Sequence, residues 1–163
     1  MLFRSFLKEA NRRQGGLFVL VRTSNPGAGK LQDRSLGPHR VYEEVADWVE
    51  GWSAASKSAD GRYGAVGAVV GATVPAQVGD LRRRMPHVWF LLPGYGAQGG
   101  SARDTADAFD ADGLGAVVNN SRGILFAYKE AKYQGKTWTD AVRAAALAMI
   151  EDLAAHTSAG RLR

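Results

Sequence analysis

The sequence has no cysteine, and this absence excludes disulfide bonds, thiolate nucleophiles and cysteine-ligated zinc sites. It also has no uninterrupted apolar run near the roughly 20 residues that a membrane-spanning helix needs. Residues 1–11 are amphipathic and carry Arg4, Lys8 and Glu9, so they lack the continuous apolar core of a secretory signal. We therefore expect a cytoplasmic protein that does not contact a membrane.

The short motifs that mark many enzyme sites are absent as well. The sequence has no HExxH metal motif, no GxxxxGK[ST] phosphate loop, no complete GxGxxG dinucleotide fingerprint and no GxSxG nucleophile elbow. Its three histidines, His39, His87 and His156, are far apart in the sequence, and we expect them to be structural or to face the solvent. These absences predict a protein without a bound metal and without serine–histidine catalysis.

The charge of the chain is moderately positive, with 21 Lys and Arg against 16 Asp and Glu, a formal net charge of +5. Such a balance can indicate nucleic acid, an acidic membrane or a phosphorylated small molecule as the partner. The charges are scattered, however, and no basic stripe with interleaved aromatic residues is present, so we expect no nucleic acid. The single tight run, Arg82 to Arg84, falls at the end of a predicted helix, where cations complement the helix dipole.

Strand-like and helix-like segments alternate along the chain. Short apolar runs predict strands at about 17–21, 65–72, 88–92 and 114–118. Helical spacing of apolar residues predicts helices at 2–13, 41–55, 75–85, 101–109, 124–133 and 137–155. Thr73 is the expected cap of the helix that begins at Pro75, and the tail from Ser158 is expected to fray. With 163 residues, of which 45% are hydrophobic, we expect one domain over residues 1–163.

This alternation is typical of an α/β protein with a parallel sheet and right-handed crossovers. Two closures remain open, a doubly wound sheet and a (β/α) barrel. Gly67, Ala68 and Gly71 would suit the crowded interior of a barrel. A complete barrel of eight units needs about 250 residues, so four units would make about half of one. The apolar run at 17–21 suits a strand that is covered on both faces.

Polar, glycine-rich segments follow the last two strands, where parallel α/β folds bind their ligands. PGYGAQGGS (93–101) would let peptide N–H groups approach an oxyanion, and Gln98 could add a side-chain amide. NNSRG (119–123) supplies Arg122, whose guanidinium matches phosphate geometry. A tight structural turn and a surface ion pair are the respective alternatives. Taken together, the two segments one βα unit apart predict a phosphate site.

Four segments of the sequence, taken in order, resemble the orotidine 5'-phosphate decarboxylase family, in the branch typical of actinobacteria and related bacteria. The segments are RTSNPGAGKLQD (22–33), GAVVGAT (67–73), FLLPGYGAQGG (90–100) and AVVNNSRGILFAY (116–128). The resemblance covers roughly residues 5–155. It implies a dimeric (β/α)8 TIM barrel that converts orotidine 5'-monophosphate into uridine 5'-monophosphate and CO2, a lyase step of pyrimidine biosynthesis. It implies neither a metal nor an organic cofactor.

The resemblance also assigns binding residues. Ser24 matches the serine that hydrogen-bonds the pyrimidine ring, while Gln98 and Arg122 match the side chains that reach the phosphate. The backbone positions around the phosphate are matched by Gly99, Gly100 and Gly123. Tyr95 and Asn25 receive no role.

One departure from the family is large, because the catalytic Asp-x-Lys-x-x-Asp motif is absent from the sequence. In the family, its lysine is the proton donor, so we expect no catalytic residue in this chain and no activity of the chain alone. Lys30 and Asp33, neighbours in the loop after the first strand, read as a solvated pair.

The resemblance implies that the chain corresponds to the C-terminal half of the enzyme. A cut barrel exposes two strand edges, so we expect self-association, as in a homodimer, or complementation by the missing N-terminal half. The alternative is a phosphate- or nucleotide-binding half-barrel module without chemistry.

Overall fold

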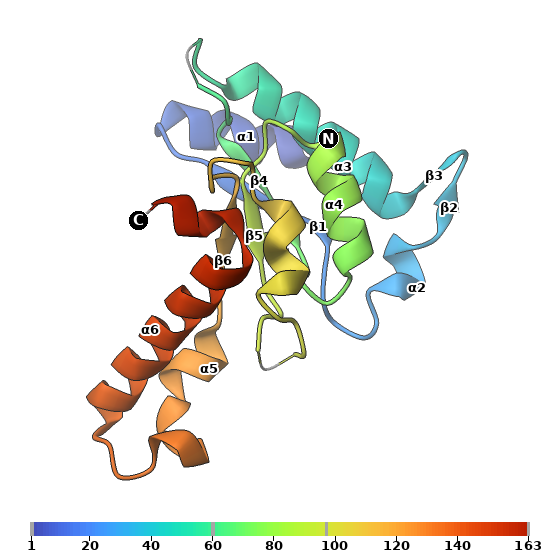
Figure 1. The fold of residues 1–163 in the computed structure, drawn as a ribbon. Helices are drawn as coiled ribbons and strands as arrows, with labels where there is room; N and C mark the ends of the chain where they lie inside the picture. Colours follow the sequence, from blue (N-terminus) through green and yellow to red (C-terminus); the bar gives the residue numbers. More distant parts are fainter. Residues whose placement is uncertain (1, 60, 97, 163) are drawn as a thin grey trace.

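Four parallel strands form the main sheet of the computed structural model (Figure 1). The structure describes residues 2–59, 61–96 and 98–162, so Met1, Asp60, Ala97 and Arg163 lie outside the description. The strands are β1 (Leu17–Arg22), β4 (Val66–Val70), β5 (Phe90–Leu92) and β6 (Ala116–Val118). A small antiparallel hairpin, formed by β2 (Ser35–Leu36) and β3 (His39–Arg40), lies in the loop after β1.

Helices occupy most of the segments between these strands. The α-helices are α1 (Leu2–Arg12), α2 (Gly29–Gln32), α3 (Val41–Ser56), α4 (Pro75–Arg84), α5 (Ser121–Leu125) and α6 (Trp138–His156). The 3-10 helices are η1 (Arg103–Ala108), η2 (Ala127–Lys129), η3 (Ala131–Tyr133) and η4 (Ser158–Leu162). Among the described residues, no helix combines the length and the apolar character needed to cross a membrane.

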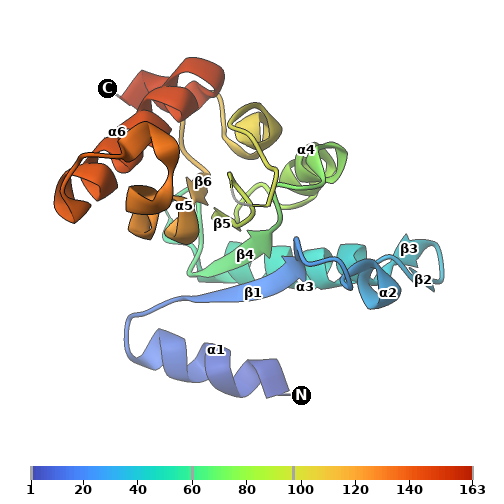
Figure 2. The same ribbon diagram turned by 90° about the horizontal axis from the view of Figure 1, so that it is seen from below.

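The strand order decides between the two closures that the sequence left open. The order is β1-β4-β5-β6, so each new strand is added on the same side of the one before it (Figure 2). A doubly wound sheet reverses direction at a switch point, whereas a barrel winds in one direction. The prediction of a partial (β/α)8 barrel is therefore confirmed, with β1 and β6 at the open edges of the sheet.

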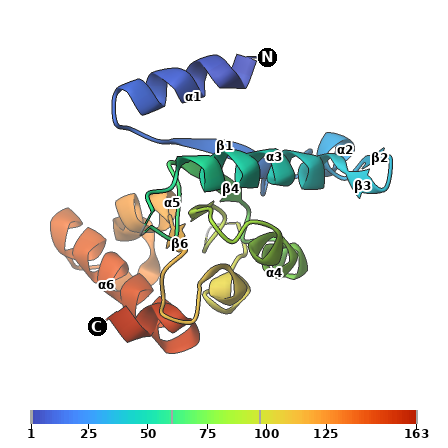
Figure 3. The same cartoon turned by 90° about the horizontal axis from the view of Figure 1, so that it is seen from above.

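The hydrophobic core lies between the sheet and the helices that pack on its outer face. Helix α3 runs along β1 and β4, and Ala46 and Val49 from it are fully buried (Figure 3). Val19 and Val21 of β1 join the same cluster, together with Phe90 of β5. The buried residues Val19 and Val21 therefore mark the face of β1 that points to the helices.

The opposite face of β1 is open, so the prediction that this strand is covered on both faces is wrong. Phe18 is 49% exposed and Leu20 is 64% exposed. Register places Leu20 beside Val69, Leu91 and Val117 in turn, in one row across the concave side of the sheet. Among the described residues no strand covers this row, and Val117 at its other end is 51% exposed, so the expectation of exposed edges and an open apolar interior is confirmed.

Two smaller differences from the sequence-based expectations concern helix type and a helix start. The segment at 101–109 forms the 3-10 helix η1 rather than an α-helix, and the Thr105 hydroxyl donates to the Ala102 carbonyl oxygen at 2.7 Å. The cap of α4 is Val74, with Pro75 at the first helical position, so Thr73 lies one residue too early.

Tertiary contacts explain the differences near the C-terminus. The segment at 124–133 breaks into short turns because Ala127 and Tyr133 are both buried in one cluster with Ala141 of α6. Residues six apart lie on different sides of an α-helix, so an unbroken helix could not bury both against α6. The tail is ordered as η4 rather than frayed, and the Ser158 hydroxyl donates to the Asp110 carbonyl oxygen at 2.6 Å.

Candidate functional site

The carboxyl ends of β1, β5 and β6 bring Ser24, Gln98 and Arg122 to the same rim of the sheet. Gln98 and Arg122 both line one small pocket of about 200 Å³. We call it the rim pocket; its lining residues are Pro93, Gly94, Tyr95, Gln98, Asn119, Asn120, Ser121 and Arg122. In Figure 1 this rim lies at the lower end of the sheet, where the loop after β5 faces α5.

Ser24 orients the Gln98 side chain. The Ser24 hydroxyl donates a 2.6 Å hydrogen bond to Gln98 Oε1. With its carbonyl oxygen occupied, Gln98 has its Nε2 amide left as a donor, and no described residue accepts from it. The amide therefore has two N–H groups available for an acceptor at the rim pocket.

Gly94 is the residue that lets Gln98, Ser24 and Thr73 come this close. Its φ angle is +103°, a conformation that side-chain-bearing residues rarely adopt. A Cβ atom at this position would lie 3.2 Å from Gln98 Oε1 and 3.3 Å from both Ser24 Cβ and Thr73 Cγ2. Glycine is needed here because the backbone passes directly beside the Ser24–Gln98 bond.

The backbone N–H groups of the predicted phosphate glycines are already engaged. Gly99 donates to the Gly96 carbonyl oxygen at 2.8 Å, and Gly100 donates to the Gly94 carbonyl oxygen at 3.0 Å. Gly123 donates to Asn120 Oδ1 at 3.1 Å. The N–H groups of these three glycines are therefore not free to bind an anion, and the side chains of Gln98 and Arg122 are the candidate donors.

Arg122 projects from α5 with an exposed side chain. Within the residues described, no carboxylate or carbonyl oxygen accepts a hydrogen bond from its guanidinium, so the alternative of a surface ion pair finds no partner. Asn120 holds the start of α5 through its bond to Gly123, which fixes the turn that carries Arg122. The rim pocket thus has one unpaired cation beside one free amide donor.

Arg22 is a buried residue that the sequence patterns did not single out, and it stabilises the loop that carries Ser24. Arg22, at the end of β1, donates to Gln77 Oε1 at 2.9 Å, to Gln32 Oε1 at 3.1 Å and to Asp33 Oδ2 at 3.1 Å. Asp33 therefore pairs with Arg22, and the expectation of a solvated pair with Lys30 is wrong. An arginine at the end of an apolar strand, with an aspartate in the following loop, is the sequence signal that could have suggested this contact.

The run from Arg82 to Arg84 is structural and contributes nothing to the rim. Arg82 is buried, stacks 4.1 Å above the Phe90 ring and donates to main-chain carbonyl oxygens, including those of Val88 and Gly115. Burial lowers the pKa of its guanidinium. Arg83 and Arg84 pair with Asp80 and Asp47, respectively.

The three histidines contact charged side chains. His87 contacts Glu50, His156 contacts Asp152, and His39 lies 3.3 Å from the Arg84 guanidinium. In the described ranges, no group of three or more histidine, aspartate or glutamate side chains is arranged to hold a metal ion.

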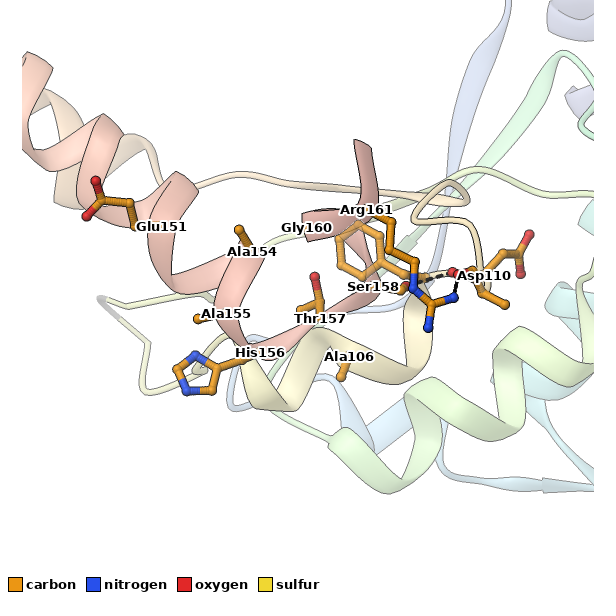
Figure 4. A pocket seen from close by; sticks show the side chains of 12 residues that line it. Ala106, Asp110, Glu151, Ala154, Ala155, His156, Thr157, Ser158, Gly160 and Arg161 are labelled. Carbon is orange, nitrogen blue, oxygen red and sulfur yellow. Dashed lines mark hydrogen bonds between the residues drawn. The ribbon is translucent and has the colours of Figure 1, made fainter. Parts of the chain in front are cut away.

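A larger pocket, of about 860 Å³, lies at the opposite end of the sheet, between the end of α6, η4 and the segment that leads into β6 (Figure 4). Ser158 and Arg161 point across it, and both donate to main-chain carbonyl oxygens of the 110–111 segment. Because its polar groups serve to dock the C-terminal turn, and because parallel α/β folds bind at the other end of their strands, we do not take it as the site.

Comparison with known proteins agrees with this architecture. The sequence profile of the "Orotidine 5'-phosphate decarboxylase / HUMPS family" matches residues 3–136. The orotidine 5'-phosphate decarboxylase of Rhodopirellula baltica is 51% identical over 152 residues, which are 91% of this chain and 50% of that protein. That of Caldicellulosiruptor bescii is 40% identical over 126 residues, 77% of this chain and 41% of the relative.

Solved structures show the same likeness. The crystal structure of a putative orotidine 5'-phosphate decarboxylase from Streptomyces avermitilis superposes with a TM-score of 0.71 at 30% identity, over 95% of this chain and 50% of that one. The Leishmania donovani UMP synthase structure gives a TM-score of 0.67 at 39% identity, over 86% of this chain and 28% of that one. This chain spans about half the length of the curated relatives it matches, and it belongs to the orotidine 5'-phosphate decarboxylase / HUMPS family.

Proposed function

We propose that this chain supplies the phosphate- and pyrimidine-binding part of an orotidine 5'-phosphate decarboxylase, which converts orotidine 5'-monophosphate into uridine 5'-monophosphate and CO2. The observation that carries the proposal is the rim pocket, where the free Gln98 amide and the unpaired Arg122 guanidinium face one small space. A dianionic phosphate is the acceptor that matches an amide and a planar, permanently charged guanidinium. The step belongs to nucleotide metabolism, so we propose that the protein acts in the cytoplasm.

Each residue at the rim has a defined role in this proposal. Gln98 Nε2 and the Arg122 guanidinium donate to phosphate oxygens, while Gly100 and Gly123 leave room for the Gly94 carbonyl oxygen and the Asn120 side chain beside the rim, and Gly99 keeps the loop open. Ser24 donates to Gln98 and keeps acceptor lone pairs on its oxygen, so it can accept from a pyrimidine N–H at the same time.

The chemical step needs residues that this sequence does not contain. The absence of an Asp-x-Lys-x-x-Asp motif leaves no lysine assigned to protonate the reaction intermediate. We propose that this lysine and its carboxylates come from another polypeptide segment, either the remainder of the barrel or a second chain in a dimer. Remote phosphate contacts would then contribute binding energy that the completed site uses in the transition state.

An apolar groove beside β1 supports the need for such a segment. It has a volume of about 580 Å³ and lies along the free edge of the strand, between α1 and α3. Phe6, Phe18 and Leu20 line it and are largely exposed in this chain. Unpaired strand edges and exposed apolar side chains are the surfaces that a further strand of a barrel would cover.

The second candidate is a nucleotide- or phosphate-binding half-barrel without chemistry. One observation favours it. The chain itself supplies the side-chain donors of the rim pocket, whereas the catalytic motif is absent from its sequence. The presence of an adjacent reading frame that encodes the motif would favour the enzyme, and its absence would favour the binding module.

One experiment tests the proposed function. The chain is mixed with a fragment that carries the first four strands and the Asp-x-Lys-x-x-Asp motif of a family member, and the loss of orotidylate absorbance is followed. We expect decarboxylation by the mixture and none by either part alone. Nucleotide binding without turnover in a stable, correctly assembled mixture would support the binding module instead.

A further inference from the structure

The glycine-rich loop at residues 93–100 has few side chains with which to hold its own position. Gly94, Gly96 and Gly99 all have positive φ angles and contribute no side-chain contacts. Among the described residues of the loop, Tyr95 and Gln98 have the only long side chains, and Gln98 lies at the rim pocket. Gln98 connects the loop to the loop after β1 through Ser24, and Tyr95 is the side chain through which it can be connected to the helices beyond.

Tyr95 connects the loop to α6. Its hydroxyl donates a 2.6 Å hydrogen bond to Asp152 Oδ2, across 57 residues of sequence. The other oxygen of the carboxylate lies 2.9 Å from His156 Nδ1, so the acceptor is itself held from the next turn of the helix. Within the part of the chain that the structure describes, this is the one hydrogen bond that joins the loop to α6.

A cavity makes the loop dependent on this bond. About 590 Å³ of space separates the loop from α6, bounded by Tyr95, Gly96 and Gly100 on one side and by Ala148 and Asp152 on the other. Close apolar packing, which usually fixes a loop against a helix, is therefore missing on this side. Tyr95 also lines the rim pocket, so a single side chain forms part of both spaces.

The loop in turn contacts the element that carries Arg122. A Cβ atom at Gly96 would lie 3.4 Å from Asn120 Nδ2, so the backbone next to Tyr95 lies against the residue that caps α5. The distance between Gln98 on the loop and Arg122 on α5 thus depends on where Tyr95 holds the loop.

We propose that Tyr95 is a positioning residue, whose hydrogen bond to Asp152 holds the glycine-rich loop where Gln98 and Arg122 can act on one anion. The inference rests on the proposed phosphate site and makes α6 part of its support. Burial, followed by the bond to Asp152, raises the pKa of the Tyr95 hydroxyl, which therefore remains a donor at neutral pH.

The test compares Tyr95→Phe with Tyr63→Phe. Tyr63 also donates to an aspartate, Asp110, but at the opposite end of the sheet, so it is a matched control for the loss of one tyrosine–aspartate bond. Amide hydrogen exchange is measured by NMR at Gly99 and Gly100, together with the affinities for uridine 5'-monophosphate and uridine.

In Tyr95→Phe we expect exchange at the loop amides to be about tenfold faster and the affinity for the monophosphate to be about fivefold to tenfold weaker, since one hydrogen bond is lost. Uridine affinity should not change, and Tyr63→Phe should leave both loop exchange and nucleotide affinity as in the parent. Asp152→Asn, which keeps an acceptor, should preserve most of the loop protection, whereas Asp152→Ala should not.

Loop exchange that is unchanged in Tyr95→Phe would overturn the positioning role. So would an equal acceleration at the core amides of β4, because that result would show general destabilisation instead. Failure of the parent chain to prefer the monophosphate over uridine would reject the proposed phosphate site, and the exchange data would still decide whether Tyr95 holds the loop.

Discussion

Ser24 and Gln98 are 74 residues apart in the sequence, yet the Ser24 hydroxyl donates a 2.6 Å hydrogen bond to the Gln98 side-chain carbonyl. This bond joins the loop after β1 to the loop after β5 across the rim of the sheet. It also decides which end of the Gln98 amide faces a ligand. The proposed phosphate site is therefore prearranged before any nucleotide binds.

Removing the Ser24 hydroxyl should release the Gln98 amide. We expect Ser24→Ala to weaken the binding of uridine 5'-monophosphate by about fivefold, since one hydrogen bond contributes about 1 kcal/mol. Calorimetry or NMR titration measures the change. Ser35→Ala, in the exposed hairpin, serves as the control and should bind as the parent does. Equal affinities in parent and Ser24→Ala would show that the bond does not orient the site.

Loss of the Arg122 cation should weaken nucleotide binding more than loss of the Ser24 hydroxyl does. A charge-assisted hydrogen bond contributes about 1.5–3 kcal/mol, so Arg122→Ala should reduce monophosphate affinity by at least about tenfold. The same titration should show that the affinity of the parent falls as salt concentration rises. Arg143→Ala, on the exposed face of α6, removes an equal charge and should change little. Unchanged nucleotide binding in Arg122→Ala would rule out the assigned role.

Arg82 should matter for folding and not for binding. Replacing it with alanine leaves several buried carbonyl oxygens without their donor, which should cost about 3 kcal/mol in the free energy of unfolding. For a chain of this size, that corresponds to a fall in Tm of roughly 6–12 °C. Thermal unfolding followed by circular dichroism measures it. Arg83→Ala, which removes only an exposed pair with Asp80, should lower Tm by no more than a degree or two. Similar Tm values for the two variants would contradict the buried role.

The open face of β1 should drive association. We expect the parent chain to elute from a size-exclusion column as a dimer or larger species, because Leu20 and Phe18 are exposed beside an unpaired strand edge. Leu20→Lys should shift the elution toward the monomer without a large loss of stability, since the side chain is already 64% exposed. A parent chain that is a stable monomer with a sharp thermal transition would refute this account of the edge.

Alkaline pH should weaken the contact between Tyr63 and Asp110. Burial, followed by the bond to Asp110, raises the pKa of Tyr63 to about 12, above the value of about 10 expected in the unfolded chain. The folded state therefore favours the protonated hydroxyl. Its stabilisation is complete below about pH 10 and is lost as pH rises toward 12. Urea unfolding of the parent and of Tyr63→Phe is measured at several pH values between 8 and 11. The free energy of unfolding should fall more steeply with pH in the parent, and parallel pH dependences would contradict the assignment.

The fold was largely predictable because each strand is a short apolar run and each run ends in polar or glycine-rich residues. The same reasoning predicted that Gln98 and Arg122 follow neighbouring strands. What it missed depends on contacts between side chains. Arg22 and Asp33 are close in sequence, and their pairing left a signal that the sequence-based prediction did not use, whereas Tyr95 and Asp152 are 57 residues apart and their local sequence gives no sign of the partner.

The site shows the same division between local pattern and tertiary contact. Gly100 and Gly123 lie close to neighbouring protein atoms, whereas a Cβ atom at Gly99 would have no described atom within 4 Å. The N–H groups of all three, which were expected near an anion, donate within the protein. The break in the predicted helix at 124–133 likewise follows from burial against α6 and not from its own residues. Sequence periodicity indicates which residues are buried, but it does not indicate which polar groups form hydrogen bonds with each other.

The central claim is that Gln98 and Arg122 bind one phosphate. It is tested most directly by measuring uridine 5'-monophosphate and uridine affinities for the parent, Gln98→Ala, Arg122→Ala and the double variant. We expect the parent to bind the monophosphate at least about tenfold more tightly than uridine, and the double variant to lose this preference with a total effect smaller than the sum of the two single effects. Equal affinity of the parent for the two ligands, or fully independent effects of the two substitutions, would contradict the account.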